Sequence, residues 1–369
     1  MVNLMNNKIA IVLKKLVDKG YDAYVVGGYV RDYLLGINSY DVDIATNADP
    51  NTIKEIYSIT SSMDNYGRFS IKDSLYNYDI MPYREEYMFE NRKPTDYKFI
   101  NDIEKDKVRR DFTVNAMYMD INGEIYDPFN GKSDIENKII RCIGDVSDKM
   151  IEDPLRILRA IRFATILDFK IEDSLLDFIK LNSSLISTIS SDRRKIELDK
   201  IFKCSNKIKG LDLIKELSLD KVLSLKYDDV KYTISTEGIW AQIESTGYNF
   251  SNQEKTLIEC IKKILEYGII DNIVLYQYGL YPCIIAGEIL GVSEAQISNV
   301  YKDMPIYTKN DINITGNDIM DLLHIKPGIK IKQILQDVEL NILNGDIKNE
   351  EEEIKEYIIE NWKWLEWMK

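Results

Sequence analysis

The sequence predicts an α/β domain at the N-terminus, a mixed sheet with helices, followed by an all-helical remainder. A short β-rich run over residues 23–26 stops at Gly27-Gly28 and is followed by a helical stretch, and two more strand patterns come before residue 127. After Arg141 strand signals become sparse and amphipathic helical segments dominate. A chain of 369 residues is long enough for two or more such domains.

Local periodicity places the individual elements. Apolar residues at helical spacing over residues 1–20 predict a first helix, and the glycine turn is followed by a helix over residues 30–35. Strands are expected over residues 39–45 and 76–81, with a helix around Ile53, Ile56 and Tyr57 between them. Later helices are expected over residues 154–168, 174–181 and 192–202, with breaks near residues 205–210, 235–238 and 345–349. The acidic run 350–353 suits the N-terminus of a helix.

Composition restricts the chemistry. The net charge of −13 argues against indiscriminate binding to nucleic acid, although 48 Lys and Arg residues leave room for a local basic patch. Four cysteines without a CxxC pair and a single histidine argue against zinc sites, a disulfide framework and Ser/His/Asp catalysis. Any catalytic metal must therefore bind carboxylates. Without an export or membrane segment in the sequence, a cytoplasmic protein is expected.

A pair of carboxylates is the first candidate site. Asp41 and Asp43 are two residues apart, so in a strand they point to one face while Val42 and Ile44 point into the core. Neighbouring carboxylates repel each other unless a cation lies between them, which favours a Mg²⁺ site. A solvated edge strand is the alternative for this pattern taken alone.

The glycine turn upstream of the carboxylates favours the Mg²⁺ site over the solvated edge strand. Gly27-Gly28 stands at a strand-to-helix turn, with Arg31 and Asp32 at the start of the helix. Glycines let backbone N–H groups approach a phosphate, the helix N-terminus attracts anions, and an arginine can neutralise a triphosphate. A metal-binding strand beside a triphosphate-binding turn is typical of phosphoryl transfer.

Residues 27–46, GGYVRDYLLGINSYDVDIAT, resemble the motif of the tRNA nucleotidyltransferase and poly(A) polymerase family, within the polymerase-β-like superfamily. The resemblance implies a polymerase-β-like palm in which Asp41 and Asp43 hold two Mg²⁺ ions, one activating the RNA 3′-hydroxyl and one bridging the triphosphate. Asp79, in a predicted strand, is the candidate third carboxylate, and a surface aspartate is the equally weighted alternative.

Residues 109–116, RRDFTVNA, are similar to the ribose-contacting segment of the same family. The resemblance implies nucleotide contacts for Arg110, Asp111 and Asn115, and a preference for NTP over dNTP. Taken alone, an Arg-Arg-Asp triplet is more often a surface ion pair of little energetic value.

A third segment resembles the EDxxR motif of the family: Glu152-Asp153-Pro154-Leu155-Arg156. On a helix, residues three apart share one face, so Arg156 can donate to a ring nitrogen while Asp153 accepts from an exocyclic amine. Cytosine and adenine present that pair of groups, whereas uracil and guanine leave polar groups unpaired at a cost of roughly 1–3 kcal/mol.

The alternative for Asp153 is a capping role, since a proline follows it and suits a first helical position. Capping does not explain the arginines at positions 156, 159 and 162, so Arg156, Arg159 and Arg162 are predicted to bind nucleotide as well. The resemblance extends through the segment 84–94, the place of the family's flexible loop, and the segments 314–318 and 326–331, which resemble tRNA-binding tail segments.

The predicted organisation is a nucleotidyltransferase palm over residues 1–140, a helical neck over 141–205 that recognises the base, and a helical body and tail over 206–369 that bind tRNA. The resemblance, closest to the class II tRNA nucleotidyltransferases, implies template-independent addition of CMP, CMP and AMP to the tRNA 3′ end from CTP and ATP with Mg²⁺. No protein partner is implied. A CC-adding or poly(A)-adding relative is the main alternative, followed by a non-catalytic RNA-binding protein and by a nucleotidyltransferase acting on a small molecule.

Overall fold

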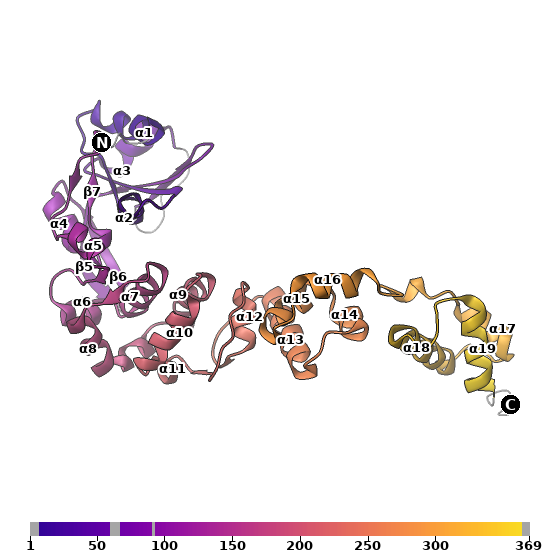
Figure 1. The fold of residues 1–369 in the computed structure, drawn as a ribbon. Coiled ribbons are helices and arrows are strands. Elements are labelled where there is room, and N and C mark those ends of the chain that lie inside the picture. The colour runs from indigo at the N-terminus through magenta and orange to yellow at the C-terminus, as the bar shows by residue number, and fades with distance from the viewer. Residues whose placement is uncertain (1–6, 60–66, 91–92, 364–369) are drawn as a thin grey trace. The chain divides into compact units, whose positions relative to one another are not determined.

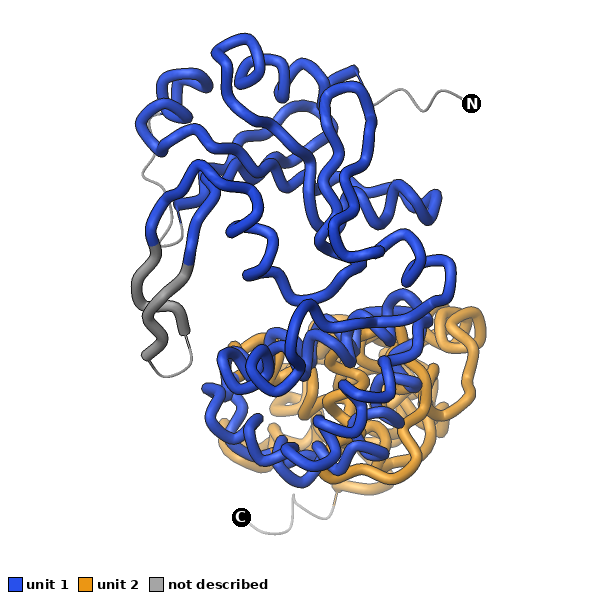
Figure 2. The backbone as a smooth tube through the Cα atoms, turned by 90° about the vertical axis from the view of Figure 1, so that its left-hand side faces the viewer, with its two compact units in different colours: residues 1–225, 246–249 blue, residues 226–245, 250–369 orange. Residues whose placement is uncertain are grey.

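The computed structural model describes residues 7–59, 67–90 and 93–363 (Figure 1). It divides the chain into two compact units, one of residues 1–225 with 246–249 and the other of residues 226–245 with 250–369 (Figure 2). The first unit contains the sheet and every predicted nucleotide-binding residue. No helix in the described part of the chain combines the length and the apolar character that a membrane span requires.

A six-stranded mixed sheet forms the N-terminal part of the first unit, with strand order β3-β4-β2-β1-β7-β8. Its strands are β1 (Tyr24–Val26), β2 (Asp41–Thr46), β3 (Phe69–Lys72), β4 (Asn77–Pro82), β7 (Tyr118–Met119) and β8 (Ile125–Tyr126). Strand β2 pairs parallel with β4 and antiparallel with β1. Helices α1 (Asn7–Val17), α2 (Gly28–Leu35) and α3 (Pro50–Tyr57) accompany the sheet.

These elements confirm the predicted strands at β1, β2 and β4 and the helices on either side of β2. The alternation along β2 has a clear physical basis, because Val42 and Ile44 are fully buried while Asp41 is exposed and Asp43 is half-buried. The edge strands β3 and β8 were not predicted.

The segment expected to be the flexible loop forms most of a two-stranded antiparallel hairpin, β5 (Arg84–Glu90) and β6 (Lys93–Phe99). Residues 84–99 include Tyr87, Phe89, Tyr97 and Phe99, and tyrosine and phenylalanine favour strands. Residues 91 and 92, between these two strands, lie outside the described residues.

The rest of the first unit is helical apart from β9 (Ile139–Ile140) and β10 (Lys170–Ile171), a short parallel pair. Its helices are α4 (Ile103–Val108), η1 (Thr113–Asn115), α5 (Gly131–Glu136), α6 (Val146–Glu152), α7 (Leu155–Ile166), α8 (Asp173–Leu181), η2 (Ser183–Thr188), α9 (Ser191–Lys203), α10 (Lys207–Glu216) and α11 (Leu219–Val222). Helix α7 packs against both α9 and α10. The predicted break near residues 205–210 is confirmed between α9 and α10, at residues 204–206, but residues 207–210 belong to α10. Gly210 lies inside α10. A glycine is needed at this position because a Cβ would come within 2.4 Å of Ile201 and 2.9 Å of Thr165.

Apart from the short strands β11 (Leu225–Lys226), which begins at the boundary of the first unit, and β12 (Glu244–Ser245), the second unit is built of helices. They are α12 (Thr236–Ala241), α13 (Asn252–Tyr267), α14 (Asn272–Tyr278), α15 (Leu280–Leu290), α16 (Glu294–Lys302), η3 (Lys309–Asp311), α17 (Gly316–Leu323), α18 (Ile329–Asn344) and α19 (Glu351–Trp362). The predicted break near 345–349 and the acidic helix start after it are confirmed. The predicted break at 235–238 is confirmed only at Ser235, which is the N-cap of α12. Gly238 lies inside α12, where a Cβ would collide with Ile285 and Thr233.

Candidate active site

Strand β2 presents its two carboxylates on the exposed face of the sheet, as the sequence pattern predicted. Asp41 accepts a hydrogen bond from the side-chain amide of Asn77 at 2.9 Å. Asp43 lies opposite Asp79 in the parallel register of β2 and β4. Strands β2 and β4 therefore bring all three predicted metal-ligand candidates to neighbouring positions on one side of the sheet.

Asp79 is already engaged by its own neighbours. Its carboxylate accepts from the Ser70 hydroxyl at 2.5 Å and forms an ion pair with Arg68 at 3.1 Å. The side chain is 30% exposed, so the surface-aspartate alternative describes its present contacts as well as the ligand hypothesis does. Asp79 does not line the cavity described below.

The charge of Asp43 is poorly compensated by the protein. Burial raises the pKa of the Asp43 carboxyl, and the negative charges of Asp79 and Asp41 raise it further, against the opposing effects of Arg110 and Arg68. In the described residues, no three acidic, histidine or cysteine side chains gather closely enough to form a complete metal site. One or two carboxylates together with substrate phosphates are nevertheless the usual protein environment of Mg²⁺, so the oxygen donors of Asp41 and Asp43 fit that ion.

The glycine turn lies directly against Asp43. Gly27 has φ +74° and ψ −137°, a conformation that disfavours any residue with a side chain, and a Cβ at this position would lie 3.1 Å from Oδ2 of Asp43. Gly28 begins α2, whose N-terminus can attract an anion. Arg31, one turn into α2, is buried and donates to Asn115 at 2.6 Å and to Asp32 at 2.7 Å.

A cavity of about 610 Å³ joins the predicted nucleotide-binding residues. Of those residues it is lined by Gly27, Gly28, Arg31, Asp43, Arg110, Asp111, Asn115, Asp153, Arg156, Arg159 and Arg162. Asp32 and Asp41 are not among its lining residues, and Asp32 instead forms an ion pair with Arg31. The excess of arginines over aspartates gives the cavity the charge that a triphosphate requires.

The Arg-Arg-Asp segment is fixed by buried carboxylate contacts. Asp106, which is fully buried, accepts from Arg109 Nε at 2.8 Å and from Arg110 Nη2 at 3.2 Å. Arg110 also donates to the Tyr118 hydroxyl at 2.8 Å. Burial opposes ionisation of Asp106, but the two guanidinium groups outweigh it and hold its pKa below the ordinary value. The triplet is therefore an interior network, and the surface ion pair considered for it is wrong.

The structure corrects the predicted geometry of Asp153. This residue does not lie on the helix of Arg156, since it ends α6 with φ −140° and ψ 95°, and α7 begins at Leu155. The cause is Pro154, because a proline disfavours helical conformation in the residue before it. The N-cap of α7 is Pro154, and the Asp153 carboxylate just before it accepts from the Leu155 N–H at 3.2 Å, so it satisfies one N–H group at the start of the helix. The carboxylate also lies 3.3 Å from Arg193 Nη2.

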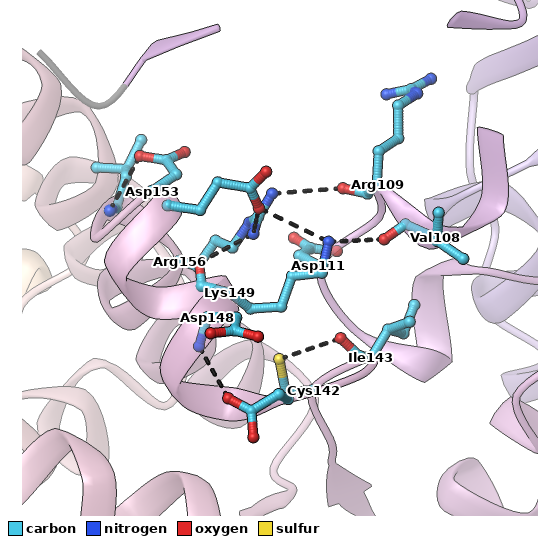
Figure 3. A network of polar contacts seen from close by, with 12 residues as sticks. Val108, Arg109, Asp111, Cys142, Ile143, Asp148, Lys149, Asp153 and Arg156 are labelled. Atoms are coloured by element: carbon cyan, nitrogen blue, oxygen red, sulfur yellow. Dashed lines mark hydrogen bonds and ion pairs between the residues drawn. The ribbon is translucent and has the colours of Figure 1, made fainter. Parts of the chain in front are cut away.

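Arg156 is held between α6 and the Arg-Arg-Asp segment (Figure 3). Its Nη1 donates to the Lys149 carbonyl at 2.9 Å and to the Glu152 carboxylate at 2.5 Å, and its Nη2 lies 3.4 Å from the Arg109 carbonyl. Lys149 in turn donates to the Val108 carbonyl at 2.7 Å (Figure 3). The guanidinium is thereby fixed in place at the wall of the cavity.

The other two arginines of α7 also have carboxylate partners. Arg159 Nε donates to Asp111 at 2.8 Å, and Arg162 Nε donates to Glu197 of α9 at 2.7 Å. Burial opposes ionisation of Asp111, but Arg159 keeps its pKa below the ordinary value. The Phe163 ring centroid lies 4.1 Å from the Arg162 guanidinium, within cation–π range.

The cavity is also lined by residues that were not among the predicted nucleotide-binding residues. They are Arg84, Arg109, Leu155, Phe163 and Arg193. Arg193 stands in the first turn of α9, in a segment that was predicted as a helix and given no chemistry. Two consecutive arginines at a helix start were the available signal, but only the packing of α9 on α7 brings one of them to Asp153.

A mixed sheet with paired carboxylates, a glycine turn against one of them and an arginine-lined cavity together define a nucleotidyltransferase. Three family models match the chain: the poly A polymerase head domain over residues 23–141, the probable RNA and SrmB-binding site of polymerase A over 168–226, and tRNA nucleotidyltransferase domain 2 over 241–358. The site and the matched head domain thus agree on the class of enzyme.

Similar full-length proteins narrow the class further. The CCA-adding enzyme of Ligilactobacillus salivarius is 33% identical, with 96% of this chain and 95% of the relative covered, and that of Lactococcus lactis subsp. cremoris is 32% identical, with 92% of both covered. The chain belongs to the family of CCA-adding enzymes.

Solved structures share the fold along nearly the whole chain. The Bacillus stearothermophilus CCA-adding enzyme in complex with CTP is 25% identical with a TM-score of 0.85, covering 99% of this chain and 100% of that one. The Thermotoga maritima CCA-adding enzyme complexed with tRNA, at 22% identity and a TM-score of 0.71 over 97% of both chains, shares the fold.

Proposed function

We propose that this enzyme adds C, C and A to the 3′ end of tRNA from CTP and ATP, with Asp41 and Asp43 as the ligands of Mg²⁺ and with Asp153 and Arg156 selecting the base. The observation that carries the proposal is the shared cavity, since Asp43, the glycine turn, Asp153 and Arg156 all line it. Membership of the family of CCA-adding enzymes supports the same substrates.

The reaction joins the RNA 3′-oxygen to the α-phosphorus of the nucleotide, while the bond from that phosphorus to the bridging oxygen breaks and pyrophosphate leaves. Bound by Asp41 and Asp43, Mg²⁺ supplies activation of the 3′-hydroxyl and charge neutralisation of the triphosphate. Asp79 is a candidate third ligand, and it would have to give up its contacts with Ser70 and Arg68 to serve as one.

The chain's own groups hold the rest of the nucleotide. The N–H groups at Gly27-Gly28 and the start of α2 bind the triphosphate, and Arg31, positioned by Asp32 and Asn115, adds positive charge there. Arg110, Asp111 and Asn115 contact the ribose. Arg159 and Arg162 line the same cavity and supply further positive charge.

Base selection uses the junction between α6 and α7. Asp153 accepts from the exocyclic amine of cytosine or adenine, and Arg156 donates to the adjacent ring nitrogen. The 3.4 Å contact of Arg156 with the Arg109 carbonyl is the longest of its three and the easiest for a base to replace. Uracil and guanine would place a carbonyl against the carboxylate, leaving polar groups unpaired.

We assign residues 1–140 to the palm, 141–205 to the neck that selects the base, and 206–369 to the body and tail that bind tRNA. We place the enzyme in the cytoplasm, where it would meet tRNA, CTP and ATP.

One experiment tests the whole proposal. Purified protein is incubated with Mg²⁺, tRNA ending before CCA, and CTP or ATP singly and together, with Asp43→Ala as the inactive control. Addition of three nucleotides supports CCA addition, a stop after two indicates CC addition, and a long tail indicates poly(A) addition. Extension with UTP or GTP as efficient as with CTP and ATP would show that Asp153 and Arg156 do not select the base.

A further inference from the structure

We propose that the edge strand β3 guides the 3′ end of the RNA to the catalytic carboxylates, with Arg68 and Lys72 binding phosphates of the RNA backbone. The inference rests on the proposed function, because it assumes that Asp41 and Asp43 serve transfer to an RNA 3′-hydroxyl. Strand β3 pairs with β4, which pairs with the catalytic strand β2.

The geometry of the reaction indicates the side from which the RNA arrives. The attacking 3′-oxygen and the departing pyrophosphate lie on opposite sides of the α-phosphorus. In the proposed function the triphosphate lies at the glycine turn, which follows β1 on one side of β2. We therefore expect the RNA to approach Asp43 from the other side of β2, where β4 and then β3 continue the sheet.

The face of β3 on this route is polar and exposed. Arg68, Ser70 and Lys72 alternate along the chain and are all exposed, whereas Phe69 is buried and Ile71 is half-buried. The three polar side chains therefore share one face of the strand, and two of them are cations.

The register of the sheet connects this face to the catalytic carboxylates. Lys72 of β3 pairs with Asn77 of β4, which pairs with Asp41 of β2. In the next row a serine of β3 pairs with Asp79, which pairs with Asp43. Neighbouring strands are about 4.8 Å apart, so the backbone of Lys72 lies about 10 Å from that of the first carboxylate.

Arg68 is placed where a phosphate can reach it. Its Nη1 donates to Asp79 at 3.1 Å, and its side chain is 47% exposed. Burial raises the pKa of Asp43 most, and the positive charge of Arg68 is one of two that oppose this rise, so Arg68 lies close to the catalytic strand. An ion pair this exposed contributes little to folding. A guanidinium has five N–H donors, so it can bind a phosphate and keep its contact with Asp79.

Charge complementarity favours an RNA strand as the occupant of this face. The chain has a net charge of −13, and Asp41, Asp43 and Asp79 repel phosphates unless cations stand nearby. Arg68 and Lys72 are four residues apart, about 13 Å along the strand, and this spacing suits successive phosphates of an extended chain better than a single anion. Neither residue lines the cavity assigned to the nucleotide.

The first test measures RNA binding by fluorescence anisotropy, without nucleotide or Mg²⁺. It compares tRNA that ends after the first C of CCA with tRNA shortened to the last base pair of the acceptor stem. We expect Arg68→Ala and Lys72→Ala each to weaken binding of the first RNA about fivefold, the effect of one polar contact. Each should also reduce the slope of log affinity against log salt by about 0.7, the value for one phosphate of a single strand. Binding of the shortened tRNA should not change, because it has no single-stranded end to lie along β3.

Kinetics of CMP addition to the same tRNA give a second measurement. Both substitutions should raise the KM for tRNA about fivefold and leave the KM for CTP unchanged, because the nucleotide cavity is separate from β3. Arg68→Lys, which keeps the charge without the planar fork, should fall between Arg68→Ala and the wild type.

Two control variants separate phosphate binding from other effects. Lys54→Ala removes a positive charge from the opposite side of β3, where Lys54 lies 5.8 Å from the ring centroid of Phe69. Ser70→Ala removes the other partner of Asp79 and keeps both cations. Both controls should bind the RNA as the wild type does. A loss in either control equal to that of Arg68→Ala would overturn the proposal, because net charge or the position of Asp79 would then explain the effect.

Normal RNA binding by both Arg68→Ala and Lys72→Ala would also overturn the role of β3, and the proposed function would stand if the wild type adds CMP. A wild type that binds the tRNA without adding CMP would overturn the proposed function and the role of β3 with it. Should Arg68→Ala not fold, the RNA affinity and KM of Lys72→Ala decide between these outcomes.

Discussion

Replacing Gly27 with alanine should slow the enzyme by displacing the Asp43 carboxylate. At φ +74° and ψ −137° an alanine is strained by roughly 1–3 kcal/mol, and its Cβ would lie 3.1 Å from Oδ2 of Asp43. Both the turn and the carboxylate must therefore move. A misplacement of about 1 Å at a reacting centre can cost ~100-fold in rate, and the 3.1 Å contact requires a smaller shift, so we expect Gly27→Ala to reduce activity by about tenfold.

Gly36 provides the control. It also has a positive φ, +69°, but a Cβ there would meet nothing within 4 Å. Gly36→Ala should lower the melting temperature through backbone strain of about 1–2 kcal/mol while nucleotide addition continues at nearly the normal rate. The assay is single-turnover CMP addition to tRNA ending before CCA, run beside thermal unfolding. If Gly27→Ala is no less active than Gly36→Ala, the turn does not position Asp43 and the reasoning fails.

Further predictions concern the charges around the site. Asp106→Asn should lower the free energy of unfolding by about 3–5 kcal/mol, because it removes the buried carboxylate charge that pairs with Arg109 and Arg110; a urea titration with an unchanged midpoint would contradict this. The pKa values of Asp106 and Asp111 are lower in the folded than in the unfolded protein, so their ionisation stabilises the fold at any pH above the unfolded-state pKa near 4. This stabilisation is lost as the pH falls through the folded-state pKa values. The free energy of unfolding from urea titrations should therefore be lower at pH 3 than at pH 5. Ionisation of Asp43 has the opposite effect on stability, because its pKa is raised in the folded protein and its charge therefore weakens the fold. Without divalent ions, Asp43→Asn should raise the melting temperature at pH 7. Adding Mg²⁺ should raise the melting temperature of the wild type and have little effect on Asp43→Asn, and chelation by EDTA should reverse the gain.

The palm could be predicted because its signals are local. The alternation of Asp41 and Asp43 with buried Val42 and Ile44 is a property of a single strand, and the glycine turn needs only its own backbone conformation. Those features identified the strand, the turn and the candidate catalytic carboxylates without knowledge of the rest of the fold.

The contacts made by distant segments could not be predicted in the same way. Arg193 reaches Asp153 across 40 residues of sequence, and Arg159 reaches Asp111 across 48. The break predicted near residues 205–210 extends too far, because Gly210 lies inside α10 and allows this helix to approach Ile201 and Thr165. Such glycines follow from packing between helices, which a single sequence does not display.

The error at Asp153 has a different origin. Spacing alone put Asp153 and Arg156 on one helical face, but Pro154 interrupts the backbone between α6 and α7. The restriction that proline places on the preceding residue was visible in the sequence and should have outweighed the spacing.

Each arginine of α7 that lines the cavity is paired with its own carboxylate outside that helix: Glu152 for Arg156, Asp111 for Arg159 and Glu197 for Arg162. These side chains are ordered before substrate arrives, so their rotamer entropy, about 0.5–1.5 kcal/mol for each, is given up on folding and does not weaken nucleotide affinity. Redesigning the enzyme to accept another nucleotide would therefore require replacing arginines together with their acidic partners, because replacing one arginine of α7 alone would leave its carboxylate without that ion pair.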